Sequence, residues 1–436
     1  MSWSDHAIWW HLQPLGFLGA ERTALPPGEP PRHRLPALAD WLDHLIALGC
    51  NGLALGPVFA SETHGYDTTD HFRIDPRLGT EKDLTELVER AASRGVRVLL
   101  DGVFNHVGRS FGPFADVARH GRASAYADWF VPEGDDFRTF EGHRHLVALN
   151  HASPAVADHV VAVLDHWLDR GVSGWRLDAA YAVPPAFWRT VTDRVRARHP
   201  EAWFSGEVIH GDYAGYVTEG GLDSVTQYEL WKAIWSSLND ANPHELAWTL
   251  RRHNAMLDVF APQTFVGNHD VTRIASRLRE PGHLAHALTV LFTVGGIPSV
   301  YAGDERAWQG VKEDREGGDD AIRPAFPADP SGLGAEGLSV QRLHQSLVGI
   351  RRRHSWLVRA RTQVHTLGNA VLTYTADDPG TGAAVAVALN FGTEPAAGRV
   401  PPAQWTHAAG DPVIDPATGS VSLPPLGWSV ATAAGT

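Results

Sequence analysis

Cysteine is almost absent from the 436-residue chain, and lysine is scarce. The single cysteine, Cys50, excludes an intrachain disulfide. Lysine occurs only at positions 82, 232 and 312, so arginine supplies nearly all of the basic charge. A membrane-spanning helix needs about 18 or more consecutive apolar residues. The best candidate, 284–302, is interrupted by a histidine, two glycines and a proline, so the sequence predicts no such helix.

Basic residues are also outnumbered, because 37 lysines and arginines face 50 aspartates and glutamates, for a net charge of −13. Nucleic acids and anionic membranes are bound through basic patches, so we expect neither as a partner. The negative charge does not exclude neutral ligands such as sugars. The first residues carry Asp5 and lack the basic and apolar regions of a secretory signal. We therefore expect a soluble, cytoplasmic protein.

Short apolar runs alternate with segments of helical periodicity along most of the chain. This alternation is typical of parallel strand–helix–strand units. Eight runs can be counted, which is the number that closes a (β/α)8 barrel. The expected fold class is therefore an α/β barrel of the TIM type, with strands at 7–10, 52–55, 96–100, 174–177, 203–208, 224–227, 264–267 and 298–301.

Two segments interrupt this alternation. Residues 105–150 are too many for an ordinary loop between a strand and a helix. From about residue 357, short strands and turns rich in glycine and proline indicate a small antiparallel β domain. The expected organisation is a barrel at 1–104 and 152–355, an inserted domain at 105–151 and a β domain at 356–436.

Polar residues directly follow several of the predicted strands. In a (β/α)8 barrel the carboxyl ends of the strands form the active site. A lone aspartate after a strand more often caps a helix, but here carboxylates recur at many strand ends. Two carboxylates that flank a bond suit glycoside hydrolysis, and no glycine-rich phosphate-binding turn is present. The acidic residues at these ends are Asp67, Asp70, Asp101, Asp178, Glu207, Asp270, Asp304 and Glu305.

Four motifs give these residues an order that resembles a known family. They are DGVFNH at 101–106, GWRLDA at 174–179, GEV at 206–208 and FVGNHD at 265–270. Together they resemble the α-amylase family, glycoside hydrolase family 13, of retaining glycosidases and transglycosylases. The resemblance implies a catalytic barrel, a small inserted domain after the third strand and a C-terminal antiparallel β-sandwich.

The resemblance also implies catalytic roles. Asp178 matches the nucleophile that forms a covalent β-glycosyl intermediate, and Glu207 matches the general acid/base. Asp270 matches the carboxylate that holds and distorts the sugar. Arg176, two residues before Asp178, is expected to keep that carboxylate ionised, because a nearby cation lowers a carboxyl pKa. We expect the carboxyls of Asp178 and Glu207 to lie about 5–5.5 Å apart, as in retaining enzymes.

Substrate-binding residues follow from the same resemblance. His106 and His269 match histidines that bond sugar hydroxyls, and Tyr66 matches an aromatic platform under the reactive sugar. Asp67 and Arg323 resemble an Asp–Arg pair that grips a terminal sugar in exo-acting members. Such a pair would close the pocket and favour short oligosaccharides. The alternative is that Asp67 is a turn residue and Arg323 a surface arginine.

Many members of this family hold a structural calcium ion, and the chain departs from that pattern. Asn105 matches one ligand, but Ala148 stands where an aspartate would bind. Tyr181 and Ala182 replace the Lys-His pair that follows the nucleophile. Calcium prefers oxygen ligands, which alanine side chains lack. We therefore expect no metal and no other cofactor.

The sequence thus predicts a retaining enzyme that hydrolyses α-glucosidic bonds of short α-gluco-oligosaccharides. A transglycosylase, or a member active on sucrose or trehalose, remains an alternative, because water and a sugar acceptor attack the same intermediate. An inactive sugar-binding or scaffold homologue is the alternative of another class. The linkage, the mode of attack and the oligomeric state are left open.

Overall fold

Eight short parallel strands form the centre of the computed structural model, which describes residues 2–315 and 317–433. An isolated parallel bridge between Thr226 and Gln263 joins the two outermost strands. The sheet therefore closes into the predicted barrel. In spatial order its strands are β13 (Ser224–Val225), β12 (Trp203–Gly206), β11 (Gly174–Leu177), β5 (Arg97–Gly102), β2 (Gly52–Leu55), β1 (Trp9–Leu12), β15 (Ile297–Tyr301) and β14 (Gln263–Phe265).

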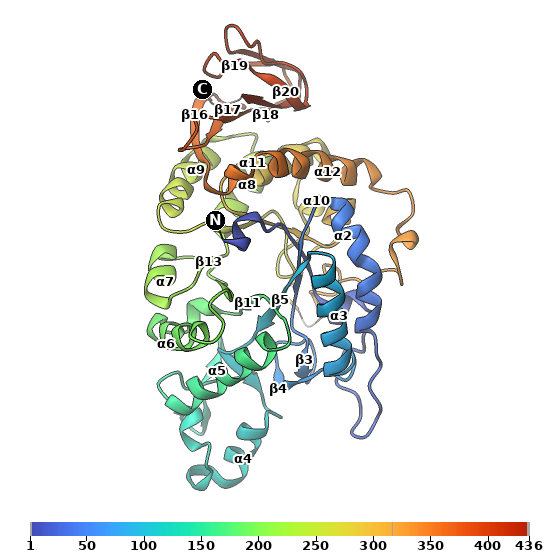
Figure 1. The fold of residues 1–436 in the computed structure, drawn as a ribbon, viewed down its shortest axis with the longest axis vertical. Helices are drawn as coiled ribbons and strands as arrows, with labels where there is room; N and C mark the ends of the chain where they lie inside the picture. The colour runs from blue at the N-terminus through green and yellow to red at the C-terminus, as the bar shows by residue number, and fades with distance from the viewer. Residues whose placement is uncertain (1, 316, 434–436) are drawn as a thin grey trace.

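Helices surround this barrel (Figure 1). Their ends follow local sequence signals: Gly49 ends α2 in a left-handed conformation, and Thr80 begins α3 with a capping box. Their buried faces pack on the outside of the strands. The helices are α1 (Pro14–Phe17), α2 (Leu42–Leu48), α3 (Glu81–Ser93), α5 (Pro154–Leu168), α6 (Pro185–Arg196), α7 (Tyr213–Gly220), α8 (Tyr228–Asn239), α9 (His244–Leu257), α10 (Ile274–Arg277), α11 (Leu284–Thr293) and α12 (Leu338–Arg353).

The first strand lies two residues later than expected. Side chains alternate along a strand, so Trp9 points into the barrel and stacks on Trp203, with ring centroids 5.5 Å apart. Trp10 points outward and stacks on Trp41 at 5.9 Å. Neither tryptophan reaches the carboxyl end of the barrel. The strand continues instead to His11, which this register turns inward.

Two excursions leave the carboxyl ends of the strands. One follows β2 and forms a hairpin of β3 (Phe59–Ser61) and β4 (Thr68–Ile74). The longer one follows β5 and covers the segment predicted as an insertion. It contains a three-stranded antiparallel sheet in the order β6-β10-β9. Its elements are β6 (His106–Gly108), α4 (Gly112–His120), β7 (Pro132–Glu133), β8 (Asp136–Phe137), β9 (Thr139–Phe140) and β10 (His143–Ala148).

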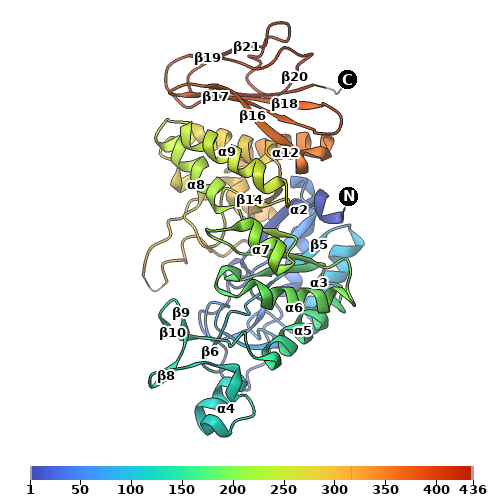
Figure 2. The same cartoon turned by 90° about the vertical axis from the view of Figure 1, so that its left-hand side faces the viewer.

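A second antiparallel β structure follows α12. A five-stranded sheet, β16-β17-β18-β22-β20, packs through small apolar residues against the pair β19 and β21. Figures 1 and 2 show it at the end of the molecule opposite α4. Among the described residues, no helix has the length and apolar content to cross a bilayer. The strands are β16 (Arg361–Leu367), β17 (Val371–Asp377), β18 (Ala384–Asn390), β19 (Ala396–Arg399), β20 (Thr406–Gly410), β21 (Ser420–Leu423) and β22 (Trp428–Ala433).

Candidate active site

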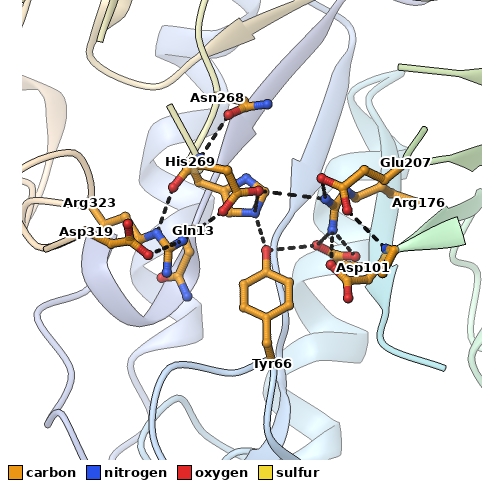
Figure 3. A network of polar contacts seen from close by, with 12 residues as sticks. Gln13, Tyr66, Asp101, Arg176, Glu207, Asn268, His269, Asp319 and Arg323 are labelled. Carbon is orange, nitrogen blue, oxygen red and sulfur yellow. Dashed lines mark hydrogen bonds and ion pairs between the residues drawn. The ribbon is translucent and has the colours of Figure 1, made fainter. Parts of the chain in front are cut away.

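The predicted catalytic residues converge at the carboxyl ends of the barrel strands. Asp178 follows β11, Glu207 follows β12 and Asp270 lies in the loop after β14. Arg176 lies within β11 and Asp101 within β5. Parallel strands bring these residues, which are far apart in sequence, to the same rim. Figure 3 shows the resulting network of polar contacts.

Arg176 lies at the centre of this network (Figure 3). Its Nη1 contacts Asp101 at 2.7 and 2.8 Å and Asp178 Oδ1 at 3.0 Å. Its Nη2 contacts Glu207 Oε1 at 2.9 Å and lies 3.9 Å from Asp270 Oδ2. One guanidinium thus orients four carboxyl groups, which a single-nitrogen cation could not do with the same geometry.

The buried carboxyl groups outnumber the cations beside them, and this shifts the pKa values of the carboxyl groups. Burial raises the pKa of Asp178 well above its usual value; Arg176 opposes the rise and Glu207 adds to it. The predicted effect of Arg176 is therefore present, but burial outweighs it. Burial likewise raises the pKa of Asp101. Such interacting groups titrate as a cluster that retains protons among its members.

Glu207 is held on both of its oxygens. Oε1 forms an ion pair with Arg176 at 2.9 Å and accepts a hydrogen bond from the hydroxyl of Tyr228 at 3.2 Å. Oε2 accepts from the backbone N–H of Ala179 at 3.0 Å. Ala179 adopts the left-handed conformation, with φ 45° and ψ 38°, which is uncommon for a residue with a Cβ. This backbone turn places its N–H against Glu207.

Asp270 is held as an ionised carboxylate. Burial would raise its pKa, but His269, Arg323 and Arg176 outweigh burial and hold the pKa well below the usual value. The Arg323 guanidinium bonds Asp270 Oδ1 at 2.9 Å and the His269 carbonyl at 2.9 Å. A second carboxylate, Asp319, forms an ion pair with the same Arg323 nitrogen at 2.9 Å.

The predicted sugar-binding residues border this cluster. The Tyr66 hydroxyl bonds His269 Nε2 and lies 3.3 Å from Asp101 (Figure 3). His106 stacks on Phe140 from β9. Burial lowers the pKa of His106 to about 3, so its ring is neutral. Among the described residues, His106 Nε2 and His269 Nδ1 are buried without a hydrogen-bond partner.

The predicted contact between Asp67 and Arg323 is wrong. Asp67 is buried and accepts hydrogen bonds from the backbone N–H and hydroxyl of Thr63, which makes it a turn residue. Arg323 is engaged by Asp270 and Asp319 instead. Arg323 therefore belongs to the cluster, and the Asp–Arg grip does not form. Any contact that either residue makes with a sugar stays a prediction.

Three residues near the carboxylates were not predicted as site residues. His11 packs edge-on against His269, with ring centroids 4.9 Å apart. With Arg176, Tyr228 and Asn268 it lines a cavity that extends into the barrel. The sequence offered one signal for His11, the polar residue after the apolar run at 7–10. Asn268 lies within the FVGNHD motif, two residues before Asp270, whereas Tyr228 is brought in by tertiary contacts alone.

The residues at the family's calcium position do not fit a calcium ion. The side chain of Ala148 has no oxygen, and Ala148 pairs with His106 in the small sheet. The Asn105 amide nitrogen lies 3.1 Å from His106 Nδ1. Over residues 2–315 and 317–433, no group of three or more histidine, cysteine or acidic side chains has the arrangement of a metal site. Calcium independence stays a prediction.

Comparison with known proteins agrees with this geometry. Residues 34–329 match the family described as the alpha amylase catalytic domain. The chain belongs to the alpha-amylase family. Both the resemblance and the fold class expected from the sequence are thereby confirmed. The boundaries expected for the inserted and C-terminal domains stay predictions.

Several alpha-amylase family members resemble the chain over much of its length. A cyclomaltodextrinase of Geobacillus thermopakistaniensis is 31% identical over 388 residues, 82% of this chain and 64% of that protein. Neopullulanase 2 of Thermoactinomyces vulgaris is 30% identical over 343 residues, 71% of this chain and 58% of that protein. The chain thus spans about three fifths of the length of these curated relatives.

A solved structure of similar size also matches. The ligand-free cyclic alpha-maltosyl-(1→6)-maltose hydrolase of Arthrobacter globiformis superposes with a TM-score of 0.83 at 26% identity, and all of both chains is covered. The alpha-amylase of H. orenii superposes with the same TM-score at 22% identity, which shows a shared fold.

Proposed function

We propose that the chain is a retaining glycoside hydrolase that cleaves α-glucosidic bonds of short α-gluco-oligosaccharides. The observation that carries the proposal is the set of three carboxyl groups, Asp178, Glu207 and Asp270, gathered around Arg176 at the barrel rim. Relatives named cyclomaltodextrinase and intracellular maltogenic amylase support this substrate class. The arrangement suits a two-step displacement at a sugar carbon.

In the proposed first step, Asp178 attacks the anomeric carbon as a carboxylate, while the proton that the carboxyl cluster retains lies on Glu207. Arg176 occupies Asp178 Oδ1, which leaves Oδ2 to form the new bond. Glu207 gives its proton to the glycosidic oxygen while the bond between that oxygen and the anomeric carbon breaks. In the second step Glu207 takes a proton from water, whose oxygen displaces Asp178 and restores the α configuration.

Asp270 and the histidines would hold the sugar during these steps. Asp270 is ionised and its side chain is partly exposed, so it can accept from sugar hydroxyls. The unpartnered nitrogens of His106 and His269 supply further positions for hydroxyl groups. The Tyr66 ring offers an apolar face beside them.

The test is maltopentaose turnover with analysis of the first products. We expect the α anomer to appear first by proton NMR, and Asp178→Asn and Glu207→Gln to lose at least about 100-fold in kcat/KM. A 5-fluoro-α-glucosyl fluoride is expected to label Asp178, visible by peptide mass spectrometry. A first product of β configuration, or an active Asp178→Asn variant, contradicts the proposal.

Transfer to a sugar acceptor is the second candidate, favoured by aromatic residues beside the catalytic centre. Tyr181 follows the nucleophile strand, lies 6.4 Å from Phe140 between ring centroids and donates to Glu141 at 2.7 Å. Aromatic faces bind sugar rings and exclude water. Longer products in the presence of added maltose would favour transfer, whereas glucose and maltose alone would favour hydrolysis.

We also propose that activity needs no calcium. The side chains at positions 148 and 182 supply no oxygen, and hard cations require several. Treatment with EDTA is expected to leave both kcat/KM and the melting temperature unchanged. Loss of either, restored by added calcium, contradicts this proposal.

A further inference from the structure

Tyr228 lies behind the proposed acid Glu207 and has no role in the steps above. It is the first residue of α8, the helix that follows β13, and β13 is the shortest strand of the barrel. Its ring is buried edge-on against Phe265, with centroids 4.9 Å apart. This packing fixes the ring, so the hydroxyl reaches Glu207 Oε1 at 3.2 Å.

A second contact fixes the direction of the Tyr228 hydroxyl. The amide nitrogen of Asn268 donates to the Tyr228 oxygen at 3.0 Å. The orientation of this amide is set in turn, because Asn268 Oδ1 accepts from the backbone N–H of Asp270 at 2.8 Å. Since the Tyr228 oxygen already accepts from Asn268, its own proton is directed to Glu207.

The charge state of Tyr228 agrees with this direction. Burial raises the pKa of Tyr228 well above its usual value, and the carboxylate of Glu207 raises it further. The hydroxyl therefore keeps its proton. The contacts form one chain from the Asp270 backbone through Asn268 and Tyr228 to Glu207, so that strands β14 and β12 are linked across β13.

We propose that Tyr228, oriented by Asn268, is a positioning residue that selects Oε2 of Glu207 as the oxygen carrying the catalytic proton. Oε1 lies 2.9 Å from the Arg176 guanidinium and accepts from Tyr228, so a positive charge and a donor both disfavour a proton there. Oε2 has one donor, the N–H of Ala179, and its remaining position takes the proton. The inference rests on the proposed function, because it assigns an atom to the acid step.

Tyr228 also contributes energy to that step. When Oε2 passes its proton to the glycosidic oxygen, Glu207 becomes a carboxylate. A hydrogen bond to a charged group is stronger than one to a neutral group. The contact from Tyr228 therefore strengthens as the proton leaves, and it stabilises the transition state more than the bound substrate.

The test compares Tyr228→Phe with wild type on two substrates. Maltopentaose has a poor leaving group that must be protonated, whereas α-maltosyl fluoride releases fluoride with little help from an acid. We expect kcat/KM to fall about tenfold on maltopentaose and less than twofold on the fluoride. We also expect the alkaline limb of the maltopentaose pH profile to move to higher pH. The matched control is Tyr374→Phe, whose buried hydroxyl bonds Thr293 away from the site.

The outcomes distinguish a failure of the role proposed for Tyr228 from a failure of the proposed function. Equal losses on both substrates would give Tyr228 a merely structural role, and unchanged values on both would give it none; either overturns the inference. Phenylalanine keeps the ring, and an unchanged melting temperature verifies the fold. If wild type cleaves neither substrate, the proposed function itself fails. Asn268→Ala frees the hydroxyl to turn and is expected to show the same pattern at smaller size.

Discussion

Arg176 is the residue on which the geometry of the site depends. Its side chain is almost fully buried, and two of its nitrogens contact carboxyl groups from three strands. Removal of one partner from a buried ion pair costs about 3–5 kcal/mol, because the remaining charges are left without compensation. Alanine at this position is therefore expected to destabilise the fold as well as the site.

The Arg176→Lys substitution tests whether the site needs only the positive charge at position 176 or also the geometry of the guanidinium. Lysine keeps one positive charge but has a single nitrogen, so it cannot contact Asp101, Asp178 and Glu207 in the same way. We expect Arg176→Lys to lower kcat/KM on maltopentaose by about 100-fold or more while the circular dichroism spectrum stays unchanged. Arg198→Lys is the control, because Arg198 is exposed and pairs with Asp165 and Asp169. If the Arg176→Lys variant stays within about twofold of wild type, charge alone suffices at this position.

Single residues also show what the sequence could and could not predict. Asp178, Glu207 and Asp270 were placed correctly at the rim, because each follows a recognisable strand within a motif. Asp67 and Arg323 were paired wrongly, because Thr63 and Asp270 compete for them and these contacts depend on loop conformation. Tyr228 and Asn268 lie 40 residues apart, and no local pattern joins them.

At the scale of elements, the loop after β14 is fixed by a buried ion pair. Arg273 contacts Asp304 Oδ1 at 2.8 Å and the carbonyl of Ile322 at 2.9 Å. The other Asp304 oxygen faces Gly267, which leaves no room for a Cβ there. Asp270 lies between Gly267 and Arg273, so Asp304 packs against one end of its loop and forms an ion pair with the other.

This packing predicts that Gly267→Ala impairs catalysis without a change at the catalytic residues. The added methyl group would overlap the Asp304 carboxylate and displace the loop. Because a shift of about 1 Å can cost about 100-fold in rate, we expect a loss of about 10- to 100-fold in kcat. Gly112→Ala is the matched control, since open space surrounds that position. If Gly267→Ala retains full activity, Asp304 does not position the loop.

The bounds of strands were predicted best where every residue of the strand is buried. Strands β2 and β11 have the expected bounds, because each begins at a glycine and is buried along its whole length. The strand β1 begins later than expected, because its polar residue His11 faces the interior. The small strands of the insertion, such as β9, were missed because their pairing depends on partners rather than on apolar pattern.

At the scale of the whole molecule, buried histidines link stability to pH. Burial lowers the pKa of His71, His253 and His286 to about 4. It lowers the pKa of His106 and His159 to about 3. Below about pH 6.5 the unfolded chain takes up protons that these native histidines do not bind, so stability falls as pH falls. Each histidine contributes about 1.4 kcal/mol per pH unit.

Five such groups are comparable with the whole stability of a protein, about 5–15 kcal/mol. We therefore expect these histidines to lower stability below about pH 6.5, which an acid titration monitored by tryptophan fluorescence measures as an unfolding midpoint. His286→Gln keeps a donor for the Asn390 carbonyl and removes the titration, so its unfolding midpoint is expected at lower pH. His407→Gln, at an exposed position, is expected to unfold like wild type. Equal midpoints in all three proteins would contradict this account.

Backbone pairing in the barrel wall is sparse at the junction between strands β13 and β14. Among the described residues, the backbones of β13 and β14 are joined by the Thr226–Gln263 bridge and by the bond from Gln227 N–H to the Gln263 carbonyl at 2.9 Å. Local opening begins where backbone pairing is sparse. We expect the amide of Gln227 to exchange with deuterium sooner than that of Leu53, whose strand is paired on both sides. Tyr228 lies next to the junction of β13 and β14, so local opening there would release the Glu207 carboxyl from Tyr228 first. Heating would therefore abolish turnover before the helices melt.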